Sequence, residues 1–161
     1  MRPLTILVAE DDLLCRMVLE RSVVQWGYKL ASAVDGERAV QLLQSGRFDV
    51  CILDWDMPKM TGVEVCRWVR ANVTGSIPYL VMLTSRDKPQ EVQSAYEAGA
   101  DDYLTKPCDL KYLRRRVNTV AEKLYRQELC LEQASHETLE RAELNPLDIY
   151  LSDLRLARRK T

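Results

Sequence analysis

The fold is decided by one stretch of the sequence, Val50-Cys51-Ile52-Leu53-Asp54-Trp55-Asp56-Met57-Pro58. Its first four residues are apolar, which predicts a short strand buried on both faces. Two acids, Asp54 and Asp56, follow at once, so the strand ends at a charged loop. A strand buried on both faces belongs to a parallel sheet that helices cover on either side.

The same arrangement repeats outward from this stretch in both directions. Apolar runs that predict strands lie at residues 4–9, 28–34, 79–83 and 103–104, and each is followed by a helical pattern. Five strand-helix repeats predict an α/β fold with a doubly wound, five-stranded parallel sheet of order 2-1-3-4-5, as in flavodoxin. Such sheets bind ligands at the carboxyl ends of their strands, where the strand order reverses.

Polar residues follow four of the five predicted strands at their carboxyl ends. They are Glu10, Asp11 and Asp12, then Asp54 and Asp56, then Thr84 and Ser85, and finally Lys106. Crowded carboxylates repel one another and need a cation, and oxygen ligands favour Mg²⁺ over zinc. A carboxylate can also attack phosphorus, while a metal, a lysine and a hydroxyl stabilise the phosphoryl oxygens. The set therefore predicts phosphoryl transfer to an aspartate, although each residue alone is more simply a helix cap or a turn.

These residues occur in motifs that resemble the receiver domain of bacterial response regulators, of the chemotaxis type. The resemblance covers about residues 4–122. Its motifs are residues 6–11 (Ile-Leu-Val-Ala-Glu-Asp), residues 53–58 with Gly62, residues 83–85 (Leu-Thr-Ser) and residues 98–107 (Ala-Gly-Ala-Asp-Asp-Tyr-Leu-Thr-Lys-Pro).

The resemblance implies a role for each position of the site. Asp54 is the expected phosphoacceptor, and Thr84 and Lys106 are expected to contact the phosphoryl oxygens. Glu10 and Asp11 are expected to hold Mg²⁺ with Asp54, and the backbone carbonyl of Asp56 is a further expected ligand. Asp12 is expected to cap the first helix instead.

The resemblance also implies a switch and a phosphoryl donor. Tyr103 is expected to turn inward as Thr84 moves, which changes the readout face at about residues 88–122. The expected donor is a phosphohistidine on a sensor histidine kinase or a phosphotransfer protein. A homodimer through residues 88–122 or through the C-terminal helix is a further expectation. We do not expect an enzyme that acts on other substrates; the chain is expected to promote only its own phosphorylation and dephosphorylation.

Two positions of the site stand out. The family often has Asp where this chain has Glu10, and Glu is an accepted variant. Asp56 lies two residues past the expected phosphoacceptor. One hypothesis is that its extra charge changes the affinity for metal and the lifetime of the phosphoaspartate; the alternative is a solvent-exposed loop acid.

Composition adds little to the function but limits the setting. The chain has 161 residues, 47% of them apolar and 29% charged, with a net charge of −1, so no general attraction to nucleic acid is expected. No apolar run approaches the roughly 20 residues of a membrane-spanning helix. Five cysteines without metal-type spacing, in a chain without a recognisable export signal, predict reduced thiols and a cytoplasmic protein.

The chain continues past the receiver-like domain of residues 1–122 into a helical extension, residues 123–161. Leu110, Val117, Leu124 and Leu131 recur every seven residues, the spacing of a coiled coil. Two interpretations stay open: the helix pairs with a second copy, or it is a solvated linker to an output domain outside this sequence. Asn145-Pro146 breaks the helix, and residues 147–159 have the pattern of a short amphipathic helix with a basic end.

Two other functions compete with the switch. Asp54, Asp56, Thr84 and Lys106 also resemble the catalytic set of haloacid-dehalogenase-type phosphatases. Those enzymes place their metal-binding acids after the lysine, whereas Glu10 and Asp11 precede Asp54 here. The second alternative is a receiver-shaped interaction module that is never phosphorylated, which the complete set of site residues disfavours. No DNA-binding or cyclase motif is visible, so the output, the cognate kinase and the oligomeric state stay open.

Overall fold

The computed structural model describes the backbone of residues 2–143 and the side chains up to residue 135. The predicted helix break at Asn145-Pro146 and the predicted helix at 147–159 lie outside the described residues. The chain divides into two compact units, Met1–Ala121 and Glu122–Thr161. The second unit begins one residue before the predicted extension.

The sheet has the predicted architecture. Its five strands are β1 (Thr5–Ala9), β2 (Lys29–Ala33), β3 (Val50–Asp54), β4 (Tyr79–Thr84) and β5 (Asp102–Thr105). They lie in the order β2-β1-β3-β4-β5, and every neighbouring pair is parallel. The order reverses between β1 and β3, so the carboxyl ends of these two strands form the crevice in which a ligand is expected.

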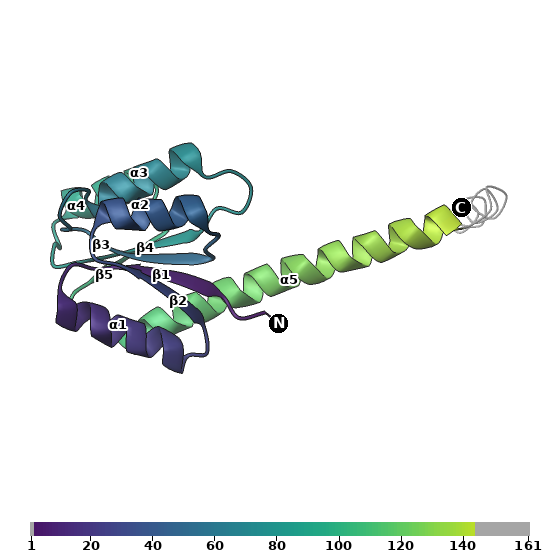
Figure 1. Ribbon diagram of the computed structural model, residues 1–161, viewed down its shortest axis with the longest axis horizontal. Coiled ribbons are helices and arrows are strands. Elements are labelled where there is room, and N and C mark those ends of the chain that lie inside the picture. Colours follow the sequence, from purple (N-terminus) through teal and green to yellow (C-terminus); the bar gives the residue numbers. More distant parts are fainter. Residues whose placement is uncertain (1, 144–161) are drawn as a thin grey trace. The chain divides into compact units, whose positions relative to one another are not determined.

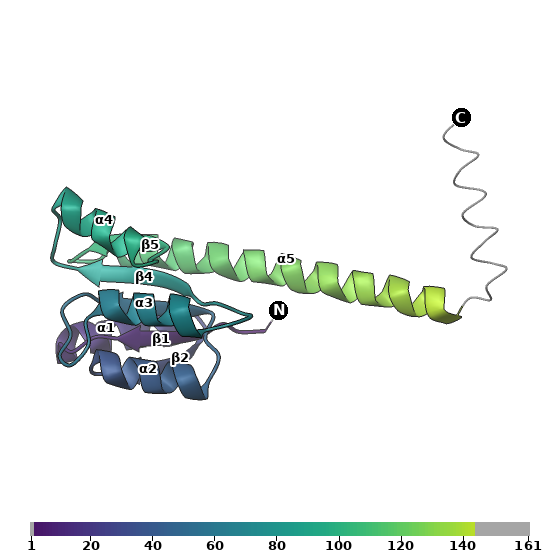
Figure 2. The same ribbon diagram turned by 90° about the horizontal axis from the view of Figure 1, so that it is seen from above.

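Helices cover both faces of the sheet. They are α1 (Leu13–Gln25), α2 (Gly36–Ser45), α3 (Gly62–Asn72), α4 (Pro89–Glu97) and α5 (Leu110–Glu143). Figure 1 shows α1 and the start of α5 on one face, with α2, α3 and α4 on the other, and Figure 2 shows the same layers from above. The described helices include none that is long and apolar enough to cross a membrane.

Side-chain caps fix where the helices begin. Asp12 accepts a hydrogen bond from the backbone of Cys15, and Asp35 caps α2 in the same way. Thr61 and Glu64 form the predicted capping box of α3. The α4 helix differs, because its N-cap Lys88 makes no side-chain capping bond and only a proline in the first turn marks its start.

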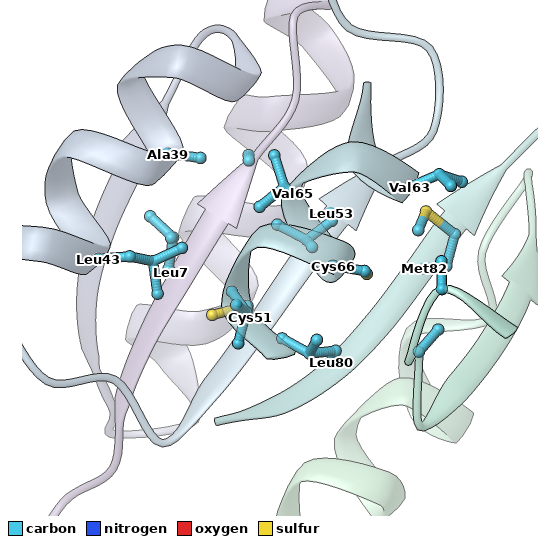
Figure 3. Packing of buried hydrophobic residues seen from close by; sticks show 14 of the residues in the cluster. Leu7, Ala39, Leu43, Cys51, Leu53, Val63, Val65, Cys66, Leu80 and Met82 are labelled. Atoms are coloured by element: carbon cyan, nitrogen blue, oxygen red, sulfur yellow. The ribbon is translucent and has the colours of Figure 1, made fainter. Parts of the chain in front are cut away.

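The sheet carries its main core on the side of α2 and α3. Leu7, Cys51, Leu53, Leu80 and Met82 point from β1, β3 and β4 toward these helices, as Figure 3 shows. The alternate residues of the same strands are equally buried toward α1 and α5, and they include Ile6, Val8, Ile52 and Leu83. Burial on both faces explains why these strands are continuously apolar.

The α1 helix buries a different face from the one that its apolar pattern indicates. Leu19, Ser22 and Val23 are the buried residues. The residues at helical spacing in the sequence, Leu14, Met17, Val18 and Val24, are each more than half exposed. Because α1 is apolar on two sides, its pattern did not determine which side faces the sheet.

The apolar residues of α5 divide between the two units. In the first unit Leu113 and Val117 are buried, as expected for a helix that packs on the sheet. In the second unit Leu124 is half-buried and Leu131 is 69% exposed.

Candidate functional site

The predicted site residues converge at the carboxyl edge of the sheet. Glu10 follows β1, Asp54 and Thr84 end β3 and β4, and Lys106 follows β5. Backbone hydrogen bonds continue the ladder past the strand ends, from the Trp55 amide to the Leu83 carbonyl (3.0 Å) and from the Lys106 amide to the Thr84 carbonyl (2.7 Å). These bonds hold the four side chains in register with one another.

Lys106 joins two of the acids. Its Nζ lies 2.9 Å from Asp54 Oδ1 and donates a hydrogen bond to Glu10 Oε1 at 3.0 Å. Asp54 is 6% exposed and Glu10 is fully buried, so the ammonium group neutralises carboxylates that water hardly reaches. Residues almost a hundred positions apart in sequence therefore meet in one charged cluster.

A cation site lies at the same place. Glu10, Asp11 and Asp54 each offer a carboxylate oxygen, and these oxygens lie within 4.8 Å of one another. Glu10 Oε2 is 2.7 Å from Lys106 Nζ but outside hydrogen-bond geometry, so this buried oxygen has no hydrogen-bond donor. Three carboxylates, of which only that of Asp11 is exposed to solvent, fit a hard divalent cation such as Mg²⁺ that keeps some of its waters.

The electrostatics of the cluster reflect its burial. Burial raises the pKa of Asp54 and of Glu10, and each of these two carboxylates is also opposed by a neighbouring acid. Burial alone would lower the pKa of Lys106, but its hydrogen bonds to Glu10 and Asp54 outweigh this effect and raise it. Lys106 therefore stays charged at neutral pH. A second cation bound beside it would further stabilise the charged forms of Glu10 and Asp54.

The loop after β4 contains the predicted switch pair. Thr84 is fully buried, and its Oγ1 accepts a hydrogen bond from the Arg86 amide at 3.0 Å. Tyr103 is half-buried, and its hydroxyl donates to the Arg86 carbonyl at 2.5 Å. Tyr103 is thus attached to the loop that carries Thr84. Ser85 is exposed, and the Lys106–Pro107 peptide bond is cis.

Asp56 has a partner that the sequence analysis missed. Arg86 donates two hydrogen bonds to its carboxylate, at 2.7 and 3.0 Å. These hydrogen bonds are the main reason why the pKa of Asp56 is lowered. A signal for the pair exists in the sequence, because Asp56 and Arg86 each lie two residues past the end of neighbouring parallel strands.

Two residues beside the site support its backbone. Arg16 donates to the carbonyl oxygens of Glu10 (2.7 Å) and Asp11 (3.1 Å), which fixes the acidic loop after β1. Gly62 lies against the backbone of the phosphoacceptor candidate, because a Cβ added there would lie 2.2 Å from the Asp54 carbonyl oxygen. Asp12 caps α1, as expected, and belongs to the helix rather than to the cluster.

Comparison with known proteins identifies the family of the chain. The family model of the response regulator receiver domain matches residues 6–118. The response regulator MprA of Mycolicibacterium vanbaalenii is 42% identical over 118 residues, which are 73% of this chain and 50% of that protein. The chain spans about half the length of the curated relatives it matches.

Solved structures give the same result. The chemotaxis protein CheY4 of Vibrio cholerae is 30% identical, with a TM-score of 0.69 over 74% of this chain and 99% of that one. The receiver domain of the sensor kinase PA1611 of Pseudomonas aeruginosa, whose structure has a magnesium ion in its active-site cleft, is 27% identical, with a TM-score of 0.67 over 73% and 97%. The chain belongs to the response regulator receiver domain family of two-component signalling.

Proposed function

We propose that Asp54 accepts a phosphoryl group from a phosphohistidine of a sensor kinase or a phosphotransfer protein. An oxygen of Asp54 attacks phosphorus, the P–N bond breaks, and the donor imidazole keeps the electron pair and takes up a proton. The product is an acyl phosphate on Asp54. The chain promotes only its own phosphorylation and dephosphorylation, so we do not propose turnover of a free substrate.

The observation that carries this proposal is the position of Lys106. Its ammonium group contacts Asp54 and Glu10 at once, so it lies where the charge of a phosphoryl group on Asp54 would develop. Thr84, at the end of the neighbouring strand, offers a hydroxyl for a phosphoryl oxygen. The same side chains thus orient the reactants and neutralise the charge of the transition state.

We propose Mg²⁺ as the cofactor, held by Glu10, Asp11 and Asp54 with the backbone carbonyl of Asp56. The ion supplies charge neutralisation between the acids and the transferred phosphoryl group. The magnesium ion in the PA1611 receiver structure supports this choice of metal. The chain itself contributes three carboxylates whose negative charge Lys106 alone does not neutralise.

An exposed apolar surface beside the site supports a protein donor. Leu13, Leu14, Met17, Val18 and Val24 of α1 are all more than half exposed. A hollow of about 290 Å³ beside this surface is lined by α1 side chains, by Glu10 and Lys106, and by the loop that follows β5. Apolar patches of this kind mark protein interaction sites, so we propose that the donor protein docks here.

The proposed consequence of phosphorylation is a change at the face formed by α4, β5 and the start of α5. The phosphoryl group adds about −1.5 to −2 charge and recruits Thr84 and Lys106. Tyr103, which contacts the Arg86 carbonyl, would follow the movement of the Thr84 loop.

The test is phosphorylation of the full chain with a small phosphodonor such as acetyl phosphate in the presence of Mg²⁺. Intact mass should show one added phosphoryl group on the wild type, none on Asp54→Asn and one on Asp101→Asn, a control acid at the opposite end of the sheet. Equal labelling of Asp54→Asn would contradict the assignment. Multiple turnovers of the donor, in place of stoichiometric labelling, would favour a phosphatase.

A further inference from the structure

Arg86, in the loop after β4, makes several side-chain contacts beside the acidic cluster. Arg86 pairs with Asp56 through two hydrogen bonds and with Glu91 at 2.9 Å. Its guanidinium group also lies 5.3 Å from the ring centre of Trp55. Trp55 directly follows Asp54, so Arg86 lies over the loop that leads away from the phosphoacceptor candidate.

These contacts fix the guanidinium group from several directions. Asp56 and Glu91 hold it on two sides, and the Trp55 ring lies beneath it. Its own backbone is held by Thr84 Oγ1 and by the Tyr103 hydroxyl. The side chains of Arg86 and Asp56 are 40% and 56% exposed. The planar guanidinium group nevertheless orients the carboxylate through paired hydrogen bonds.

The ion pair with Arg86 changes the effect that the Asp56 carboxylate can have on the site. Unpaired, Asp56 would be a fourth carboxylate at the edge of a cluster that already contains Glu10, Asp11 and Asp54. Paired with Arg86, its carboxylate is directed toward the loop after β4. The structure therefore offers a reason why this chain can carry an acid two residues past Asp54 without adding a fourth carboxylate ligand to the cation site.

We propose that Arg86 is a positioning residue that holds the Asp56 carboxylate away from the acidic cluster and thereby limits the affinity of the site for Mg²⁺. The proposal rests on the proposed function, because it assumes that Glu10, Asp11 and Asp54 bind the ion. The sequence suggested that the charge of Asp56 acts on the site directly. Here the effect of that charge depends on its pairing with Arg86.

The test is a double-mutant cycle on the full chain, with the Mg²⁺ dissociation constant measured by isothermal titration calorimetry. Arg86→Met keeps most of the aliphatic stem and releases Asp56. We expect it to tighten Mg²⁺ binding by about three- to tenfold, the effect of one unit charge near a divalent ion in a partly solvated site. In an Asp56→Asn background the same substitution should change the constant by less than about twofold, because no carboxylate is left to release.

The matched control is Arg70→Met. Arg70, in the last turn of α3, is also an arginine in an ion pair, with Asp101 at 2.8 Å, and this pair lies beside the amino-terminal end of β5, away from the site. The Arg70→Met substitution removes the same charge and should leave the dissociation constant for Mg²⁺ unchanged. Thermal melts of all variants in the absence of Mg²⁺ verify that each one is folded.

The outcomes separate the two proposals. An equal effect of Arg86→Met with and without Asp56 would make Arg86 an independent charge and overturn the positioning role. So would an unchanged dissociation constant in Arg86→Met. A wild-type chain that binds no Mg²⁺ at all would instead remove the proposed cofactor, and with it the basis of this inference.

Discussion

Gly62 sets the strictest steric requirement of the site at the scale of single residues. A Cβ there would lie 2.2 Å from the Asp54 carbonyl oxygen and 3.0 Å from the sulfur of Met82. The nearest atom belongs to the backbone of β3 and cannot move without moving Asp54. The start of α3 therefore packs directly against the backbone of Asp54 and fixes its position.

Gly62→Ala should accordingly destabilise the protein by about 2–3 kcal/mol, because a forced contact in a well-packed region costs this much. Urea denaturation followed by circular dichroism measures the change. Gly46→Ala is the control, since its added Cβ would meet no atom closer than 3.7 Å, and it should change the free energy of unfolding by less than about 0.5 kcal/mol. Equal effects of the two substitutions would refute the packing argument.

The charge on Asp54 should cost stability in the absence of metal. Burial raises the pKa of Asp54 in the folded state above its unfolded value. Folding stability is then lost as the pH rises from the unfolded pKa, about 3.9, through the folded pKa. Asp54→Asn should therefore melt a few degrees above the wild type at pH 7 without Mg²⁺. Thermal melts near about pH 3.5, below the unfolded pKa, should show the difference shrink, and a difference that grows on acidification would contradict it.

Most residues of the cluster could be predicted from the sequence, because strand ends of a parallel sheet meet at one edge whatever the details of packing. Glu10, Asp54, Thr84 and Lys106 are all of this kind. Asp56 and Arg86 lie at equivalent positions past neighbouring strands, but the pair was missed because its contact depends on the directions of two loop side chains. Such directions follow from contacts between segments 30 residues apart rather than from any local pattern.

At the scale of the element, α1 is the helix whose surface needs an explanation. It buries Leu19 and Val23 against the sheet and exposes a second apolar side to solvent. The sequence shows that α1 is a helix and where its caps lie, but a helix that is apolar on two sides has no single amphipathic face. Only the packing against β1 and β2 shows which side is left exposed.

Val18→Ser tests that exposed side. Val18 is 53% exposed, so the substitution should change the free energy of unfolding by less than about 0.5–1 kcal/mol. Phosphotransfer from a phosphorylated histidine donor protein should slow by about tenfold, the equivalent of ~1.4 kcal/mol of lost docking energy, while labelling by acetyl phosphate stays unchanged. Ile77→Ser, an apolar residue 46% exposed just before β4, is the control that should alter neither rate. Slower labelling by both donors would place the effect in the site instead of in docking.

At the scale of the whole molecule, the fold and the extension differ in how far sequence could lead. Five strand-helix repeats predicted a doubly wound parallel sheet, and the structure confirms both that sheet and the expected strand order 2-1-3-4-5. The heptad spacing predicted a long helix, and α5 runs from Leu110 to Glu143. What the leucines of the second unit contact is a property of an assembly, and a single chain does not contain that information.

A coiled coil between two copies gives a definite expectation for those leucines. If Leu124 and Leu131 occupy core positions of a parallel pair, the wild type should sediment as a dimer and the double variant Leu124→Lys/Leu131→Lys as a monomer. Leu131 is 69% exposed in the single chain, so the substitutions should leave the melting of the first unit unchanged. A wild type that sediments as a monomer at all accessible concentrations would support the linker interpretation.

The place of Trp55 gives the chain a built-in optical reporter. Its indole ring lies under the Arg86 guanidinium group and belongs to the residue next to Asp54. The other two tryptophans lie elsewhere: Trp26 is the C-cap of α1, and Trp68 lines a separate hollow with Phe48 and Pro78. Cation binding or acyl phosphate formation should therefore change the emission of one indole selectively, so that stopped-flow fluorescence can follow the reaction in real time without any attached dye.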